Sequence, residues 1–111
     1  MRFDKMTIKL QEALAEAQTY CEREKQPYIE CEHLLLELMK DKEGLTYSIL
    51  NKSGANSENV LSQLQTGCSM FPKVTNEIPQ IHISLTFKSV LNKAFEEASA
   101  MKDEFLSAEH I

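Results

Sequence analysis

The fold is decided by the stretch Tyr28-Ile29-Glu30-Cys31-Glu32-His33-Leu34-Leu35-Leu36-Glu37-Leu38, because a close copy of it returns later in the chain. The copy is Phe105-Leu106-Ser107-Ala108-Glu109-His110-Ile111, which lies 77 residues further on. The Glu-His pair aligns without a gap, and an aromatic residue precedes it in both copies. Upstream, the same offset places Leu14 on Leu91, Ala17 on Ala94 and Lys25 on Lys102. A repeated segment of this kind indicates an internal duplication.

Apolar spacing predicts four helices and no strand in the first half. The first, over about residues 4–25, has one apolar stripe consisting of Met6, Leu10, Ala13, Leu14, Ala17 and Cys21. Either Asp4 or Thr7 can cap its start, and Pro27 ends it. A leucine-rich helix from Glu30 to about Lys40 should be the central element. Two further helices follow Gly44 and Asn56-Ser57; we expect Gly54 to adopt a left-handed conformation between them and the fourth helix to fade near Gly67.

The second half is predicted to repeat this pattern in part. Residues 66–83 contain two prolines, and Ile81-His82-Ile83 alternates like a strand; lacking a visible partner, it is interpreted as loop, with isoleucines packed on the helices. Ser84 is expected to cap a helix over 85–102, and Ser107 the start of a last one. The predicted layout is repeat 1 over about 4–67, a linking loop over 68–83 and partial repeat 2 over 84–111. Because the copy stops one residue after its Glu-His pair, we expect a truncated second repeat, cut from a longer polypeptide.

Length, charge and cysteine usage narrow the class of protein. A chain of 111 residues is one domain, and its net charge of −5 argues against binding nucleic acid or anionic lipid. No apolar run has the length of a membrane span and no signal peptide is visible, so cytoplasmic residence is the default expectation. Cys21, Cys31 and Cys68 follow no disulfide pattern, which suits free thiols. Cys31-Glu32-His33 resembles half a metal site, but the second ligand pair of a structural zinc site is missing, and we expect no metal.

No motif for catalysis is present. Adjacent residues on a helix point about 100° apart, so the histidine of a Glu-His pair cannot orient its own glutamate. With three glycines in the chain there is no glycine-rich phosphate loop. Helix-terminal acids and partly buried histidines account for both pairs. The aromatic residues expected in the core are Phe71, Phe87, Phe95 and Phe105.

The motifs together resemble the N-terminal domain of the Clp ATPase chaperones over essentially all of the chain. They are the opening Met1-Arg2-Phe3-Asp4-Lys5-Met6-Thr7, Ala13-Leu14-x-x-Ala17, Ile29-x-x-Glu32-His33-Leu34-Leu35-Leu36 and the second copy. The opening and the long loop before Ser84 look most like the disaggregase branch, ClpB. The resemblance implies an all-α, pseudo-twofold domain of two four-helix repeats, attached to a hexameric AAA+ ATPase. ATP and Mg would bind to the full-length protein, and this chain, which is not itself an enzyme, would need no cofactor.

The resemblance also implies a function and its residues. The expected role is to engage exposed apolar segments of unfolded or aggregated polypeptides; the alternative is an adaptor-docking domain of a Clp protease ATPase of the ClpA or ClpC type. We expect the isolated chain to be monomeric. Thr7, Asp103 and Glu109 match positions that cluster on one surface in the family, although from the residues alone they are helix caps.

The expected substrate groove of the family is less well matched. Lys93, Glu97 and His110 stand where apolar residues are expected on the last two helices. A charged residue cannot provide a desolvated apolar contact, so the groove should be more polar, or Phe95 and Met101 should supply the apolar contacts instead.

Overall fold

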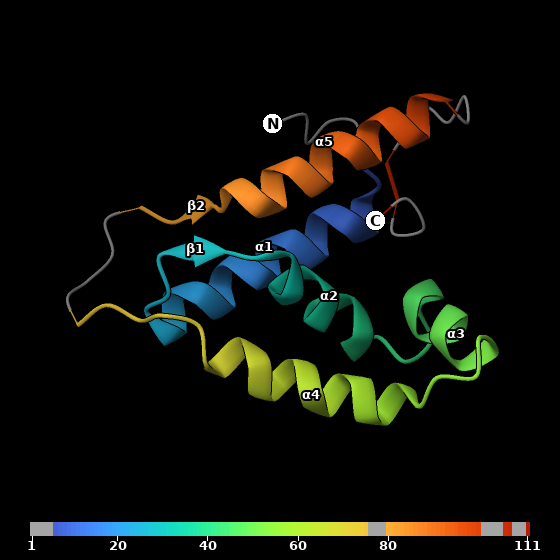
Figure 1. The fold of residues 1–111 in the computed structure, drawn as a ribbon, viewed down its shortest axis with the longest axis horizontal. Coiled ribbons are helices and arrows are strands. Elements are labelled where there is room, and N and C mark those ends of the chain that lie inside the picture. Colours follow the sequence, from blue (N-terminus) through green and yellow to red (C-terminus); the bar gives the residue numbers. More distant parts are fainter. Residues whose placement is uncertain (1–5, 76–79, 101–105, 108–110) are drawn as a thin grey trace.

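The computed structural model describes residues 6–75, 80–100, 106, 107 and 111, and it is mostly helical, which confirms the predicted class (Figure 1). Its elements are, in order, α1 (Ile8–Glu24), β1 (Tyr28–Ile29), α2 (Cys31–Lys40), α3 (Leu45–Lys52), α4 (Ser57–Ser69), β2 (His82–Ile83) and α5 (Leu85–Ala100). Helix α2 contacts all four other helices and is the central element, as predicted. Figure 1 shows α4 below α2 and α5 on the opposite side, above α1. In the part described, no helix has the length and hydropathy that crossing a bilayer requires.

Helix α1 begins at Ile8, later than the predicted start at Asp4. The reason is Thr7, which has an extended backbone (φ −64°, ψ 157°) and whose Oγ1 accepts a hydrogen bond from the N–H of Leu10 at 3.3 Å. Thr7 is therefore the cap. Met6, predicted on the helical stripe, is instead extended, although it is buried as expected. The helix ends at Glu24, and its C-cap Lys25 has a φ of 57°, which turns the chain before Pro27.

Two predictions were wrong: that the first half contains no strand, and that Ile81-His82-Ile83 is an unpaired loop. Strand β2 pairs in parallel with β1, so that Tyr28 lies opposite His82 and Ile29 opposite Ile83. The two strands lie side by side in Figure 1. An isolated parallel bridge also joins Met6 to Leu106. Each pairing is too short to show in a pattern of residues and joins segments far apart in the sequence.

The two pairings are copies of each other under the 77-residue offset. The N–H of Thr7 donates to the carbonyl of Leu106 at 2.9 Å, and the N–H of Ser84 donates to that of Ile29 at 3.1 Å. The caps repeat too: Ser84 Oγ accepts from the N–H of Phe87 at 3.1 Å, as Thr7 does from that of Leu10. Each repeat thus pairs its first segment with the second segment of the other repeat, which is the interlocked geometry of a pseudo-twofold duplication.

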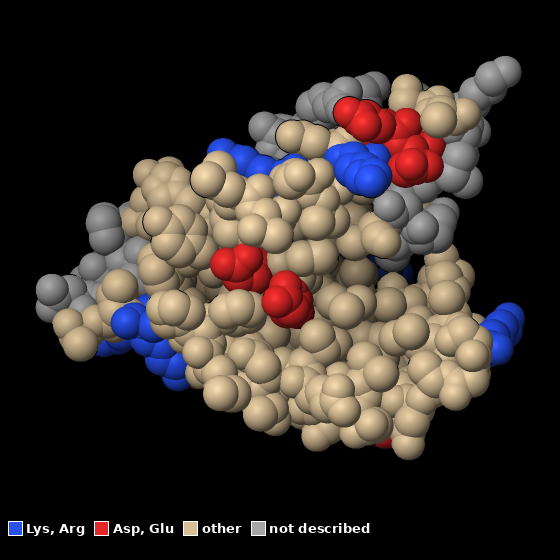
Figure 2. Space-filling model, in the orientation of Figure 1, with Lys and Arg blue, Asp and Glu red and all other residues tan. Residues whose placement is uncertain are grey.

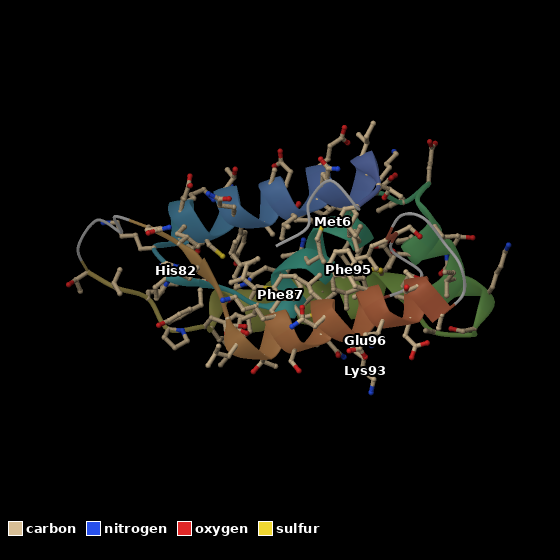
Figure 3. The ribbon with its side chains drawn as sticks, turned by 90° about the horizontal axis from the view of Figure 1, so that it is seen from above. Met6, His82, Phe87, Lys93, Phe95 and Glu96 are labelled. Atoms are coloured by element: carbon tan, nitrogen blue, oxygen red, sulfur yellow. The ribbon has the colours of Figure 1, made fainter. Side chains whose placement is uncertain are left out.

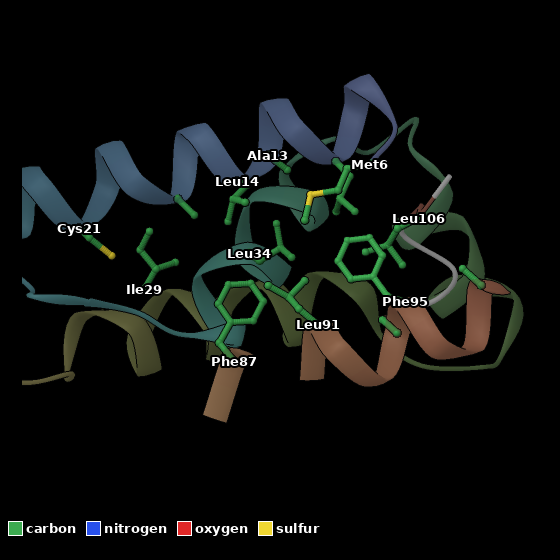
Figure 4. Close-up of a cluster of buried hydrophobic side chains, with 14 residues drawn as sticks. Met6, Ala13, Leu14, Cys21, Ile29, Leu34, Phe87, Leu91, Phe95 and Leu106 are labelled. Atoms are coloured by element: carbon green, nitrogen blue, oxygen red, sulfur yellow. The ribbon is translucent and has the colours of Figure 1, made fainter. Parts of the chain in front are cut away.

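The hydrophobic core lies between α1, α2 and α5. Phe87 and Ala17 are 0% exposed, and the predicted stripes of α1 and α5 both point inward (Figure 4). Figure 4 shows Met6 and Leu106 closing one end of this cluster and Cys21 the other. Ile81 and Ile83 pack against the cluster, as the sequence predicted. The core is therefore shared by both repeats.

A buried chain of hydrogen bonds ties α1, α2 and α4 together. His33 Nδ1 accepts from the N–H of Glu30 at 2.8 Å, and its Nε2 lies 2.6 Å from Gln26 Oε1. The amide nitrogen of Gln26 donates to the carbonyl of Cys68 at 2.7 Å. Gln26 and His33 are each 1% exposed, so His33 is fully rather than partly buried.

Helix α4 runs to Ser69 and does not fade near Gly67. A glycine inside a helix costs about 1 kcal/mol relative to alanine. Burial of Cys68 and the bond that its carbonyl accepts from Gln26 favour the helical conformation at this point. Between α3 and α4, Gly54 has a φ of +90°, which confirms the predicted left-handed turn.

Candidate binding groove

An open groove of about 800 Å³ lies between the first half of α1 and the turn that joins α2 to α3. Its apolar lining comes from three separate elements: Ala13 of α1, Leu38 of α2 and Leu45 of α3. Leu45 is 53% exposed, although it is a large apolar side chain. The volume falls in the range of roughly 300–1,000 Å³ that protein pockets for ligands occupy. The groove can therefore accommodate several side chains of another molecule.

Negative charge dominates the rim of the groove. Its charged members are Lys9, Glu12, Glu16, Glu37, Asp41 and Glu43. Lys9 Nζ lies 3.6 Å from Asp41 Oδ2, and both side chains are exposed, so this ion pair is weak. Among the described residues, no ion-pair partner faces Glu12, Glu16 or Glu43. Figure 3 shows oxygen-tipped side chains along the outward side of α1. The groove is thus a region of negative potential.

Thr7 lies at one end of this groove. It is half-buried at the start of α1 and lines the groove together with Ser107, the counterpart of Glu30 under the 77-residue offset. Asp103 and Glu109, predicted to share a surface with Thr7, lie outside the described residues. The expected helix that Ser107 would cap also lies outside them. Of the three residues predicted to share a surface, only Thr7 belongs to the described part of the chain.

Lys93 and Glu97 lie on the exposed side of α5 and do not line the groove. Figure 3 shows Lys93 pointing away from the core while Phe87 and Phe95 point into it. Figure 2 shows acidic and basic side chains side by side over α5. Phe95 is only 9% exposed and belongs to the core, which confirms the core prediction and excludes the alternative that it supplies apolar contacts to a partner. His110 and Met101 lie outside the described residues.

A second, smaller hollow of about 330 Å³ lies beside β1 and β2. The described residues that line it are Gln11, Leu14, Ala15, Gln18, Ile29, Ile81 and Ile83, and none of these side chains is charged. It offers apolar contact without a charge that would select a partner. The larger groove is for this reason the better candidate site.

The Glu32-His33 pair has no geometry for acid–base chemistry. Because Nδ1 of His33 accepts a backbone N–H, its Nε2 bears the proton and donates to Gln26. Burial lowers the pKa of His33, while the charges of Glu30 and Glu32 oppose that shift in part. Both ring nitrogens are occupied, so the imidazole is a structural group.

The thiols are similarly inert. Burial is the main cause that raises the pKa of Cys21 to about 12 and that of Cys68 to about 11, and it also raises the pKa of Cys31. In the described ranges, no three His, Cys, Asp or Glu side chains are grouped so that they could hold a metal ion.

The residues that line the groove were not singled out from the sequence, Thr7 apart. Glu12 and Glu16 lie outside the apolar stripe that predicts the first helix, and no motif in the sequence marks Asp41 or Leu45. A detectable signal was the acidic spacing of Glu12 and Glu16, which places both on one side of α1.

Comparisons with known proteins agree with this fold. The family model of the Clp repeat (R) N-terminal domain matches residues 5–111. The "Chaperone protein ClpB" of Bacteroides thetaiotaomicron is 37% identical over 111 residues, which are 100% of this chain and 13% of that protein. Among solved structures, the N-terminal domain of the ClpV1 ATPase from an E. coli type VI secretion system superposes with a TM-score of 0.87 at 20% identity, covering 96% of this chain and 64% of that one. A complex of the ClpV N-domain with the VipB peptide gives 0.80 at 17% identity, over 96% and 64%.

Proposed function

Because the chain belongs to the family of Clp repeat N-terminal domains, we propose that it is the substrate-engaging module of an ATP-dependent protein disaggregase. Its groove would bind exposed apolar segments of unfolded or aggregated polypeptides. The chain spans 13% of the length of its ClpB relative, so ATP and Mg would bind, and ATP would be hydrolysed, in other parts of a hexameric AAA+ protein. The hexamer would be the second partner, and the domain would act as a monomeric module within it.

The observation that carries this proposal is the half-exposed Leu45 beside Ala13 and Leu38 in an open groove. An apolar lining left in contact with water on a folded domain favours a partner that covers it. Thr7, one of the residues for which a binding role is predicted, lines this groove, which supports the proposal. Binding roles for Asp103 and Glu109 stay part of the proposal.

The predicted partner residues on α5 define a second candidate face. Lys93 and Glu97 are exposed there, and with His110 they would form a polar contact region rather than an apolar one. Such a face would favour folded partners over unfolded chains. It supports the alternative function, the docking of a defined adaptor, as would the structure in which a ClpV N-domain holds the VipB peptide.

A titration with a permanently unfolded protein, followed by NMR shift mapping, tests the proposal. We expect fast-exchange shifts at Thr7, Ala13, Leu38 and Leu45. The matched variants are Leu45→Ser, which should weaken binding, and Leu85→Ser, which changes a leucine that is 82% exposed and does not line the groove. Equal loss of binding in both variants, or shifts confined to α5, would contradict a substrate site in this groove.

A further inference from the structure

We propose that the groove between α1 and the α2–α3 turn selects cationic amphipathic segments, in which apolar side chains alternate with lysine or arginine. The inference rests on the proposed function, because it specifies which polypeptide segments the groove would take. The observation behind it is that the lining of the groove combines apolar side chains with an excess of carboxylates.

The negative charge of the rim argues against anionic segments and against neutral apolar ones. Five carboxylates and one amine line the groove; Glu37 is paired with Lys40 at 3.0 Å and Asp41 with Lys9, which leaves Glu12, Glu16 and Glu43 without an ion-pair partner among the described residues. Glu12 and Glu16 stand one helical turn apart on α1, and Asp41, the C-cap of α2, lines the same groove, so carboxylates come from both of these elements. An anionic segment would be repelled. A neutral apolar segment would displace water from these carboxylates without replacing its hydrogen bonds.

The apolar lining excludes a simple polycation. Covering the exposed side chain of Leu45, with Ala13 and Leu38 next to it, requires apolar groups from the occupant. A chain of lysines would leave this surface wet and would lose the hydrophobic contribution of its burial. A single segment can meet both requirements if its apolar side chains enter the groove and its lysine or arginine side chains reach the acidic rim.

Lys9 should compete with the cations of a bound segment. It is the one amine among the described lining residues, and its ion pair with Asp41 joins the start of α1 to the end of α2 at 3.6 Å. An incoming lysine or arginine would compete with Lys9 for this carboxylate. Removing the charge of Lys9 should therefore strengthen binding, which burial of apolar area alone does not predict.

The test is fluorescence anisotropy with four labelled peptides. One is amphipathic with apolar residues at helical spacing and lysines between them, two have glutamine or glutamate in place of lysine, and one is oligolysine. The lysine peptide should bind best and the glutamate peptide worst, with the difference shrinking as salt is added. Glu16→Gln should weaken binding of the lysine peptide about two- to fivefold, and Lys9→Gln should strengthen it by a similar factor.

The control is Glu96→Gln, which makes the same change of net charge on the exposed side of α5 (Figure 3). It should leave the affinity within error of the parent. If the lysine, glutamine and glutamate peptides bind equally, or if Glu16→Gln and Glu96→Gln act alike, charge selection is overturned while the proposed function stands. If oligolysine binds as tightly as the amphipathic peptide, the apolar contribution is overturned. If no peptide binds, both the inference and the proposed function fail.

Discussion

The Nε2 atom of His33 lies 2.6 Å from the Oε1 atom of Gln26, and both side chains are almost completely shielded from solvent. This contact joins the segment after α1 to the start of α2. Through the Gln26 amide it reaches the carbonyl of Cys68 in α4. The arrangement makes the polar centre of the first repeat sensitive to any change that leaves one of these groups without its partner.

Replacing Gln26 with alanine should destabilise the protein by about 1–3 kcal/mol, because it leaves the Nε2–H of His33 buried without a partner. It also removes one of the hydrogen bonds that the carbonyl of Cys68 accepts, another coming from the N–H of Phe71 at 3.4 Å. Urea unfolding followed by circular dichroism measures the difference. Gln18→Ala is the control, since its amide bonds to Glu22 on the exposed surface and should matter by less than about 0.5 kcal/mol. Equal effects of the two substitutions would show that the buried chain contributes nothing.

Stability should fall as the pH drops below 6.5, the ordinary pKa of histidine. Burial lowers the pKa of His33 in the folded state, so in this range the unfolded chain binds a proton that the folded protein does not. The contribution is fully present above pH 6.5 and is lost as the pH falls towards the lower folded-state pKa. NMR titration of the His33 imidazole signals checks the cause. A His33 pKa at or above 6.5 would refute it.

Ser84→Ala should cost about 1–2 kcal/mol, and Thr7→Ala a smaller amount. Each loses the acceptor that caps its helix, and Ser84 Oγ also donates to Glu30 Oε1 at 2.6 Å in a more buried setting. Thermal unfolding of Ala and of hydroxyl-preserving variants (Ser84→Thr, Thr7→Ser) compares the two caps. The hydroxyl-preserving variants should regain most of the loss. Comparing Thr7→Ala with Thr7→Ser also separates a capping role from a binding role. If Thr7→Ala still binds substrate more weakly after correction for its lower stability, Thr7 contacts the substrate directly.

Alkylation should modify Cys31 before the other two thiols. Cys21 and Cys68 are 0% exposed and burial raises their pKa values to about 12 and 11, whereas Cys31 is half-buried. Peptide mass spectrometry after timed iodoacetamide treatment gives the order, and all three should react quickly once the protein is unfolded. Early modification of Cys21 in the folded protein would mean that the core opens locally.

The helices of this protein could be predicted from the sequence because each one is encoded locally. The stripe of α1, the cap at Ser84 and the turn at Gly54 depend on spacing and on backbone preferences of single residues. The pairing of β1 with β2 depends on contacts between distant residues, and two-residue strands leave no periodicity to find. The repeat held a clue, since the offset that aligns Ile29 with Leu106 also aligns Met6 with Ile83.

The candidate site was less predictable. Thr7 was found through the family resemblance and through its capping chemistry. The acidic rim was missed because Glu12 comes from α1 while Asp41 and Glu43 come from the turn between α2 and α3, and no local pattern shows that they line one groove. The depth at which His33 is buried could not be foreseen either, because its partner Gln26 lies beyond a turn and a strand.

The interlocked strand pairing has a consequence for how this protein folds. Helical domains fold quickly when most of their contacts are local. Here neither half can complete its pairing alone: Ile29 must meet Ile83, and Met6 must meet Leu106 from nearly the whole length of the chain away. Closing such long loops costs entropy before any contact compensates for it, so contact order rather than helix formation should set the folding rate. One repeat produced by itself would find its missing strand only in a second copy, and it should therefore exchange segments as a dimer at high concentration.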